Sequence, residues 1–119
     1  MWLFTKHGFF SVVTTENPDE NMIQIRARRR VDLVALLSNA PSVVSSGMHT
    51  IIETRNSDYP FRVIVTRYTW ETIAGWLAEG IDYHNFKGQI RDANYSHFAL
   101  TVWEAGRRML HKFSEGTWR

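Results

Sequence analysis

Cysteine is absent from this sequence of 119 residues. Its absence excludes disulfide bonds, metal sites built from thiolates, and a cysteine nucleophile. A chain without cysteine suits a reducing compartment, and we expect the protein to be cytoplasmic.

Long apolar runs are missing too. The opening stretch MWLFTKHGFFSVV is interrupted by Lys6, His7 and Gly8. No basic segment precedes it and no small-residue cleavage site follows it, so it does not have the pattern of a signal peptide. It is also too short to span a bilayer. We therefore expect no membrane partner.

Motifs for metals, phosphates and nucleophilic catalysis are absent as well. No two histidines have the spacing of a metal site, and no loop carries enough carboxylates for calcium or magnesium. The glycines are scattered and form no phosphate-binding loop, and there is no GxSxG motif. We therefore expect neither a metal nor another cofactor.

Charge of one sign does not dominate the chain either. The formal net charge is +2, and no long block of like charge occurs. Affinity for a polyanion therefore has to come from a local cluster. The hydrophobic fraction of 44% and the aromatic fraction of 13% are those of a packed protein. The length fits a single domain that covers residues 1–119.

Hydropathy patterns predict strands in the first half of the chain. Residues 2–14 are expected to form one strand that is broken or bulged near Gly8. Residues 22–27 alternate, which places Ile23, Ile25 and Ala27 on one face of a second strand. Two further strands flank the turn sequence RNSD and predict a hairpin.

Helical spacing predicts three main helices. Asp32 is a candidate N-cap for the first, and Thr69 is a candidate N-cap for the second, which ends at Gly80. The third and longest covers about residues 93–112 and follows a short helical turn around Phe86.

The order of these elements indicates a fold class. It contains a βαββα run that is part of a split βαβ unit, and the N-terminal strand is expected to lie beside the first strand of that run. We therefore predict an α+β, ferredoxin-like fold. Its antiparallel sheet has four strands with helices on one face, and an extra helix follows at the C-terminus.

Three phrases resemble a known group of sequences. WLFTKHGFFSVV, SDYPFRVIV and IDYHNFK resemble stretches of a family of small, uncharacterised bacterial proteins, in which a WLFTKxGFFS opening and a DYxNFK stretch recur. The resemblance covers most of the chain. It implies a compact bacterial domain and transfers no activity.

An arginine cluster offers the first candidate site. The stretch IQIRARRRVD holds Arg26, Arg28, Arg29 and Arg30 at the end of a predicted strand. Alternation places Arg26 and Arg28 on the sheet face away from the helices, while Arg29 and Arg30 fall at the turn into the first helix. Lys6, at the predicted bulge, is a further candidate contact for an anion.

The arginines have several interpretations. With Trp2, Phe4 or Phe10 beside them, they would resemble the aromatic and basic sheets on which RNA-binding folds stack bases. They also fit an acidic protein surface, a contact between subunits, or a solvated edge. We favour a non-catalytic binding or regulatory protein that meets nucleic acid or an acidic protein through these side chains.

A polar and aromatic segment, residues 82–97, supports an alternative of another class. There, His84 or His97 is a candidate general acid or base, with Tyr83 or Tyr95 as hydrogen-bonding partner and Lys87 for an anionic group. The protein would then be a small enzyme or a small-ligand binder. A surface helical turn explains the same residues without any function.

The last helix predicts self-association. Its apolar residues form two adjacent stripes, and one is enough to cover a sheet. The second is free for a neighbouring helix or another chain, and we expect a homodimer. The stripes consist of Phe98, Val102, Ala105 and Met109, and of Ala99, Trp103, Gly106, Leu110 and Phe113.

Overall fold

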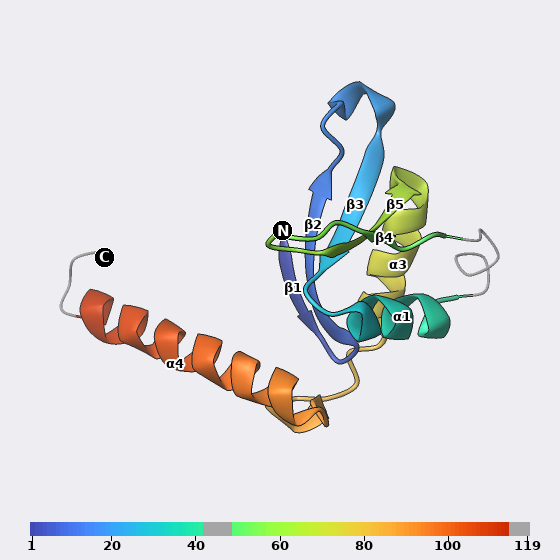
Figure 1. The fold of residues 1–119 in the computed structure, drawn as a ribbon. Helices are drawn as coiled ribbons and strands as arrows, with labels where there is room; N and C mark the ends of the chain where they lie inside the picture. The colour runs from blue at the N-terminus through green and yellow to red at the C-terminus, as the bar shows by residue number, and fades with distance from the viewer. Residues whose placement is uncertain (42–48, 115–119) are drawn as a thin grey trace. The chain divides into compact units, whose positions relative to one another are not determined.

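A computed structural model describes residues 1–41 and 49–114, with the backbone alone for 111–114. The chain divides into two compact units, Met1–Asp82 and Tyr83–Arg119, and each is described by itself. Figure 1 shows the sheet and two helices of the first unit and the long helix of the second. The prediction of one domain concerns how these units associate, and it stays a prediction.

The N-terminal segment forms a hairpin and not the single strand that the sequence predicts. Strand β1 (Trp2–Thr5) turns back into β2 (Gly8–Thr14), and β2 runs antiparallel to β3 (Met22–Ala27). Thr5 pairs with Gly8, so only two residues form the turn. Such a short turn needs an unusual backbone conformation nearby.

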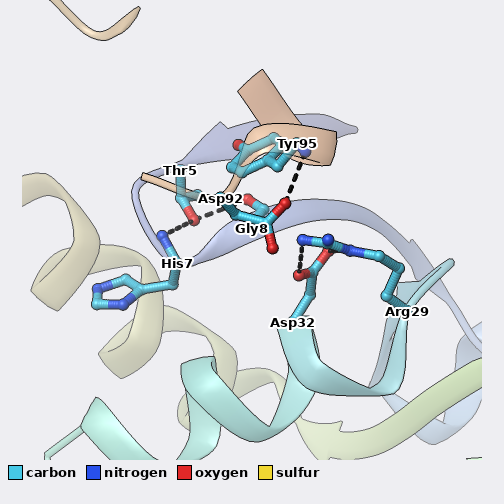
Figure 2. Close-up of polar contacts among 7 residues, drawn as sticks. All are labelled: Thr5, His7, Gly8, Arg29, Asp32, Asp92 and Tyr95. Atoms are coloured by element: carbon cyan, nitrogen blue, oxygen red, sulfur yellow. Dashed lines mark hydrogen bonds and ion pairs between the residues drawn. The ribbon is translucent and has the colours of Figure 1, made fainter. Parts of the chain in front are cut away.

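Gly8 supplies that conformation. Its φ is +143°, a backbone conformation that residues with a Cβ atom rarely adopt. A Cβ atom placed there would lie 2.6 Å from Cγ of Asp32. The Thr5 hydroxyl completes the turn, because it donates to the Gly8 carbonyl and accepts from the His7 N–H (Figure 2). The sequence signal at Gly8 was therefore real, but it marks a reversal of the chain.

The sheet has five antiparallel strands instead of the predicted four. Its remaining strands are β4 (Ile52–Glu53) and β5 (Phe61–Thr66), and the order is β1-β2-β3-β5-β4. Strand β5 lies between β3 and β4 and is antiparallel to both, as the predicted hairpin around residues 55–58 requires. The extra strand arises from the reversal before Gly8.

Helices α1 (Arg30–Asn39) and α3 (Arg67–Glu79) cover one face of this sheet (Figure 1). Their buried residues include Leu36 and Ile73, which pack with Ile25 and other apolar strand residues into one core. Each of these three side chains is fully buried, which stabilises the fold by about 1.5–3 kcal/mol per side chain. The predicted alternation of the third strand is confirmed, because Ile23, Ile25 and Ala27 are all buried.

The two predicted N-caps are displaced by three residues. Helix α3 begins after Thr66, whose hydroxyl accepts from the Thr69 N–H at 3.1 Å. Helix α1 begins after Arg29, so Asp32 lies in its first turn and not at the cap. The predictions missed the first turn of each helix because hydrophobic spacing marks the buried residues of a helix and not its first residue.

The second unit contains a short 3₁₀ helix, η2 (Lys87–Gln89), and the long helix α4 (Ala93–Ser114). Asp92 precedes α4 and accepts from the Tyr95 N–H at 2.9 Å (Figure 2), in the manner of an N-cap. At η2 the side chain of Asn85 accepts from the Lys87 N–H at 3.1 Å. The predicted C-terminal helix is thus present.

Among the described residues, no helix is both long and apolar enough to cross a bilayer.

Candidate functional site

The sheet face opposite α1 and α3 is called the outer face here. One row of directly paired residues crosses all five strands on this face. Trp2 pairs with Ser11, Ser11 with Arg26, Arg26 with Arg62, and Arg62 with Ile52. The two arginines are therefore direct neighbours on β3 and β5, where opposed side chains have Cβ atoms about 4.5–5.5 Å apart.

Arg26 is half-buried in this row. Its Nη2 atom donates to the Ser11 hydroxyl at 2.7 Å, and its guanidinium lies 4.7 Å from the centroid of the Tyr59 ring. Ser11 is itself 1% exposed, so the hydrogen bond is shielded from water. Both partners are uncharged.

Arg62 has a similar environment across the strand pair. Its Nη1 atom donates to Oε1 of Gln24 at 3.1 Å, and its Nη2 atom donates to the Ser57 hydroxyl at 3.4 Å. The sequence reasoning missed this residue, although the alternation of FRVIVT places it on the same face as Ile64.

The charge of this pair is not neutralised within the described chain. Neither Arg26 nor Arg62 forms an ion pair with a carboxylate of residues 1–41 or 49–110. The Nε atoms of both are buried and have no hydrogen-bond partner there. Like charges on opposed strand positions destabilise a sheet, and a buried donor without a partner costs about 1–3 kcal/mol. An oxyanion bound beside the two guanidinium groups would offset the repulsion between their charges.

The loop between β4 and β5 covers part of the outer face. A backbone hydrogen bond from Thr54 N–H to the Pro60 carbonyl, 2.7 Å long, closes this loop and turns Tyr59 onto the sheet. Tyr59 is 8% exposed, and the guanidinium groups of Arg26 and Arg28 each lie 4.7 Å from its ring centroid. The outer face is therefore less open than the alternation alone predicts. Cation–π contacts hold its arginines in place.

Aromatic side chains occupy the β1–β2 side of the outer face. Phe9 is buried, with Phe4 at 4.7 Å and Trp2 at 6.3 Å between ring centroids. The guanidinium of Arg28 lies 5.4 Å from the Phe9 ring. Trp2 is 71% exposed. Of the aromatic residues expected beside the arginines, Trp2 and Phe4 are there, whereas Phe10 belongs to the core.

Arg29 and Arg30 do not join this group of side chains. Nη2 of Arg29 lies 2.6 Å from Oδ1 of Asp32, and its Nε atom reaches the other carboxylate oxygen at 3.4 Å (Figure 2). The unfavourable cation at the start of α1 is thus neutralised by a buried carboxylate of the same helix. Arg30 is the first residue of α1 and is exposed.

Lys6 is also committed elsewhere. It lies in the turn between β1 and β2, and its Nζ atom donates to the Gly80 carbonyl at the C-terminal end of α3, 3.3 Å away. A cation is favourable at that end of a helix. The neighbouring His7 stacks on Trp76 at 4.9 Å. Burial, and secondarily the charge of Lys6, lower the pKa of His7.

The candidate catalytic side chains of the polar and aromatic segment, residues 82–97, do not form a common site. His84 and His97 are both exposed, one before η2 and the other on α4. Within the described part of the chain, neither imidazole makes a hydrogen bond or an ion pair. Tyr95 is buried, whereas Tyr83 is half-buried with its ring 6.2 Å from that of Phe86.

Lys87 has a different partner from the one expected. Its ammonium lies 4.2 Å from the ring centroid of Trp103 on α4, and the guanidinium of Arg107 lies 5.3 Å from the same ring. Lys87 is therefore engaged in a cation–π contact within its own unit. Of the six predicted anion contacts, Arg26 and Arg28 are the two that the structure brings together on the outer face.

Clusters of metal-ligating side chains are not found either: the described residues contain no group of three or more histidine and carboxylate side chains that would hold an ion. In comparisons with known proteins, no family model, no curated protein and no solved structure matches the chain.

Proposed function

We propose that this chain is a non-catalytic nucleic-acid-binding protein whose outer face contacts phosphate groups. The observation that carries the proposal is the pairing of Arg26 with Arg62 on adjacent strands, with uncharged hydrogen-bond partners only. Two guanidinium groups side by side match the planar, bidentate recognition of phosphate.

Nucleic acid is favoured over an acidic protein because aromatic residues share the face. Trp2 belongs to the same row as the two arginines, and Phe9 and Tyr59 lie under the guanidinium of Arg28. Proteins that bind single strands combine basic and aromatic side chains in this way. Binding of an acidic protein would explain the basic side chains but not the exposed indole of Trp2.

The alternative of a small enzyme has less support. Its candidate bases, His84 and His97, are exposed, and Tyr95 is buried. A general acid or base needs a hydrogen-bonding neighbour that orients it. The contacts described for residues 82–97 instead build a helix N-cap, a turn and a cation–π pair.

Two finer predictions belong to the same proposal. We infer a ferredoxin-like arrangement for strands β2, β3, β5 and β4, because β5 inserts between the two strands that α1 connects, and β1 is then an added edge strand.

We also propose the predicted homodimer, because four apolar side chains on α4 are 39–64% exposed, namely Val102, Trp103, Met109 and Leu110. The side chain of Phe113, on the same predicted stripe, lies outside the described residues.

The test is a binding titration with salt as the variable. A labelled oligonucleotide of about 12 nucleotides is titrated with protein at about 50 and 200 mM salt, and fluorescence anisotropy gives the dissociation constant. The double variant Arg26→Gln/Arg62→Gln is compared with the wild type. Loss of two phosphate contacts should reduce the slope of log K against log salt by about 1.4 for a single strand.

A matched control separates a site from general charge. Arg108→Gln/Arg91→Gln removes two exposed arginines of the second unit and should leave the slope unchanged. Absence of binding by the wild type at about 50 mM salt overturns the proposal, because phosphate contacts are strongest there. Equal losses in the double variant and in the control would place the binding site elsewhere. Binding of labelled poly-aspartate without any binding of the oligonucleotide would identify an acidic protein as the partner.

A further inference from the structure

Trp2 suggests which form of nucleic acid the outer face takes. We infer that the partner is single-stranded and that one of its bases stacks on the indole of Trp2, an inference that rests on the proposed function. Phosphate contacts alone would not identify a single strand, because a duplex presents phosphates too, at about twice the charge per unit length. An exposed aromatic ring in the phosphate-binding row does distinguish them.

The indole is exposed and held in position. Trp2 is 71% exposed, although its backbone is paired with Ser11 and its ring makes an edge contact with Phe9 at an interplanar angle of 67°. An edge contact leaves the faces of the indole uncovered by Phe9. Phe9 is itself fixed between Phe4 and the guanidinium of Arg28. The indole of Trp2 is therefore held in place before a ligand binds.

The spacing suits one strand of nucleic acid. Trp2 and Arg26 lie on β1 and β3 with β2 between them, so their backbones are about 10 Å apart. Arg62 is one strand further along the same row. A base on Trp2 and a phosphate between the two guanidinium groups thus belong to neighbouring positions of one polynucleotide. The strand would run across the sheet from β1 toward β5.

A duplex cannot make the same contact. Its bases are already stacked on one another, so their faces are closed to Trp2 unless a base leaves the helix. The row contains no protruding helix or ribbon that would enter a groove, because Ser11, Arg26 and Arg62 are buried or half-buried on the sheet surface. The face therefore favours strands whose bases are already free.

The experiment compares three ligands, of which the single and abasic strands carry equal charge and the duplex carries about twice as much. These are a single strand of about 12 nucleotides, the same strand annealed to its complement, and an abasic strand of the same length. RNA and DNA versions are both used, and either satisfies the inference. Wild-type protein should bind the single strand about tenfold more tightly than the abasic strand, and more tightly than the duplex.

Variants of exposed aromatic residues provide the comparison. Trp2→Leu should bind the normal and abasic strands equally, Trp2→Phe should retain part of the preference, and Tyr68→Leu on α3 should retain all of it. Trp2 and Tyr68 are equally exposed, and circular dichroism checks that each variant is folded. If Trp2→Leu is unfolded, Trp2→Phe still tests the inference, because it should retain only part of the preference for the normal strand over the abasic strand.

The outcomes separate this inference from the proposed function. A wild type that binds the abasic strand or the duplex as well as the single strand overturns base stacking, while phosphate binding stands. An undiminished preference in Trp2→Leu overturns the assignment to Trp2. Absence of binding to every ligand at low salt overturns the proposed function and this inference with it.

Discussion

Replacement of Gly8 by alanine should destabilise the protein strongly. A residue with a Cβ atom at a φ of +143° carries strain of about 1–3 kcal/mol. The new methyl group would also lie 2.6 Å from Cγ and 2.7 Å from Cβ of Asp32, an overlap that requires the neighbours to shift. Overpacking of this kind costs about 1–3 kcal/mol. The expected loss is therefore about 2–6 kcal/mol of the total free energy of unfolding.

Urea unfolding followed by circular dichroism measures this loss. Gly75→Ala is the matched control, because Gly75 lies inside α3 with open space where its Cβ atom would be. There the same substitution should stabilise the protein by about 0.5–1 kcal/mol. The two changes thus have opposite expected signs.

A coupling experiment identifies the cause. Asp32→Ala removes the Cγ and Oδ1 atoms that the new methyl group would meet. The Gly8→Ala change should therefore cost about 1 kcal/mol less in the Asp32→Ala background than in the wild type. A Gly8→Ala protein within about 0.5 kcal/mol of wild-type stability would refute the reasoning, since neither the backbone strain nor the overlap would then exist.

Three further predictions follow from single contacts. The pKa of His7 is lowered in the folded state, so the free energy of unfolding should fall as the pH drops below about 6.5. Urea titrations at several pH values should show this fall reduced in His7→Gln and retained in His84→Gln. Asp32→Asn should cost about 1–3 kcal/mol in the same assay, because it weakens a buried charge-assisted hydrogen bond; an unchanged midpoint would contradict this. Leu110→Lys on the exposed stripe of α4 should shift the mass seen by light scattering toward the monomer, and Leu100→Lys, on another side of the helix, should not.

Sequence reasoning predicted the parts of the fold that depend on periodicity. The alternation around Ile25 identified a half-buried strand, and helical spacing up to Gly80 identified α3, in which Trp70 and Ile73 are buried. The sequence RNSD marked the hairpin between β4 and β5. Each of these signals is local, and burial on one face is sufficient to produce it.

The reversal at Gly8 was missed because its cause is not local. Lys6 and His7 carry no turn signal, and the turn depends on the φ of Gly8 and on its packing against Asp32. Arg62 was missed for a related reason. Its role depends on the register that places it opposite Arg26, and register is set by the whole sheet. Only two of the predicted arginines share a face, because Arg29 has a nearer carboxylate in Asp32.

The strand order has a consequence for how the chain folds during synthesis. Strand β3 meets β2 through residues 15 positions apart, such as Ser11 and Arg26, but it meets β5 through Gln24 and Arg62, which are 38 positions apart. At a synthesis rate of about 5–20 residues per second, β3 waits about 2–8 s for its second neighbour. During that interval it is an unprotected edge that other chains can pair with. A fragment that stops before Phe61 should therefore aggregate, and the docking of β5 should be the slow step when the full chain refolds.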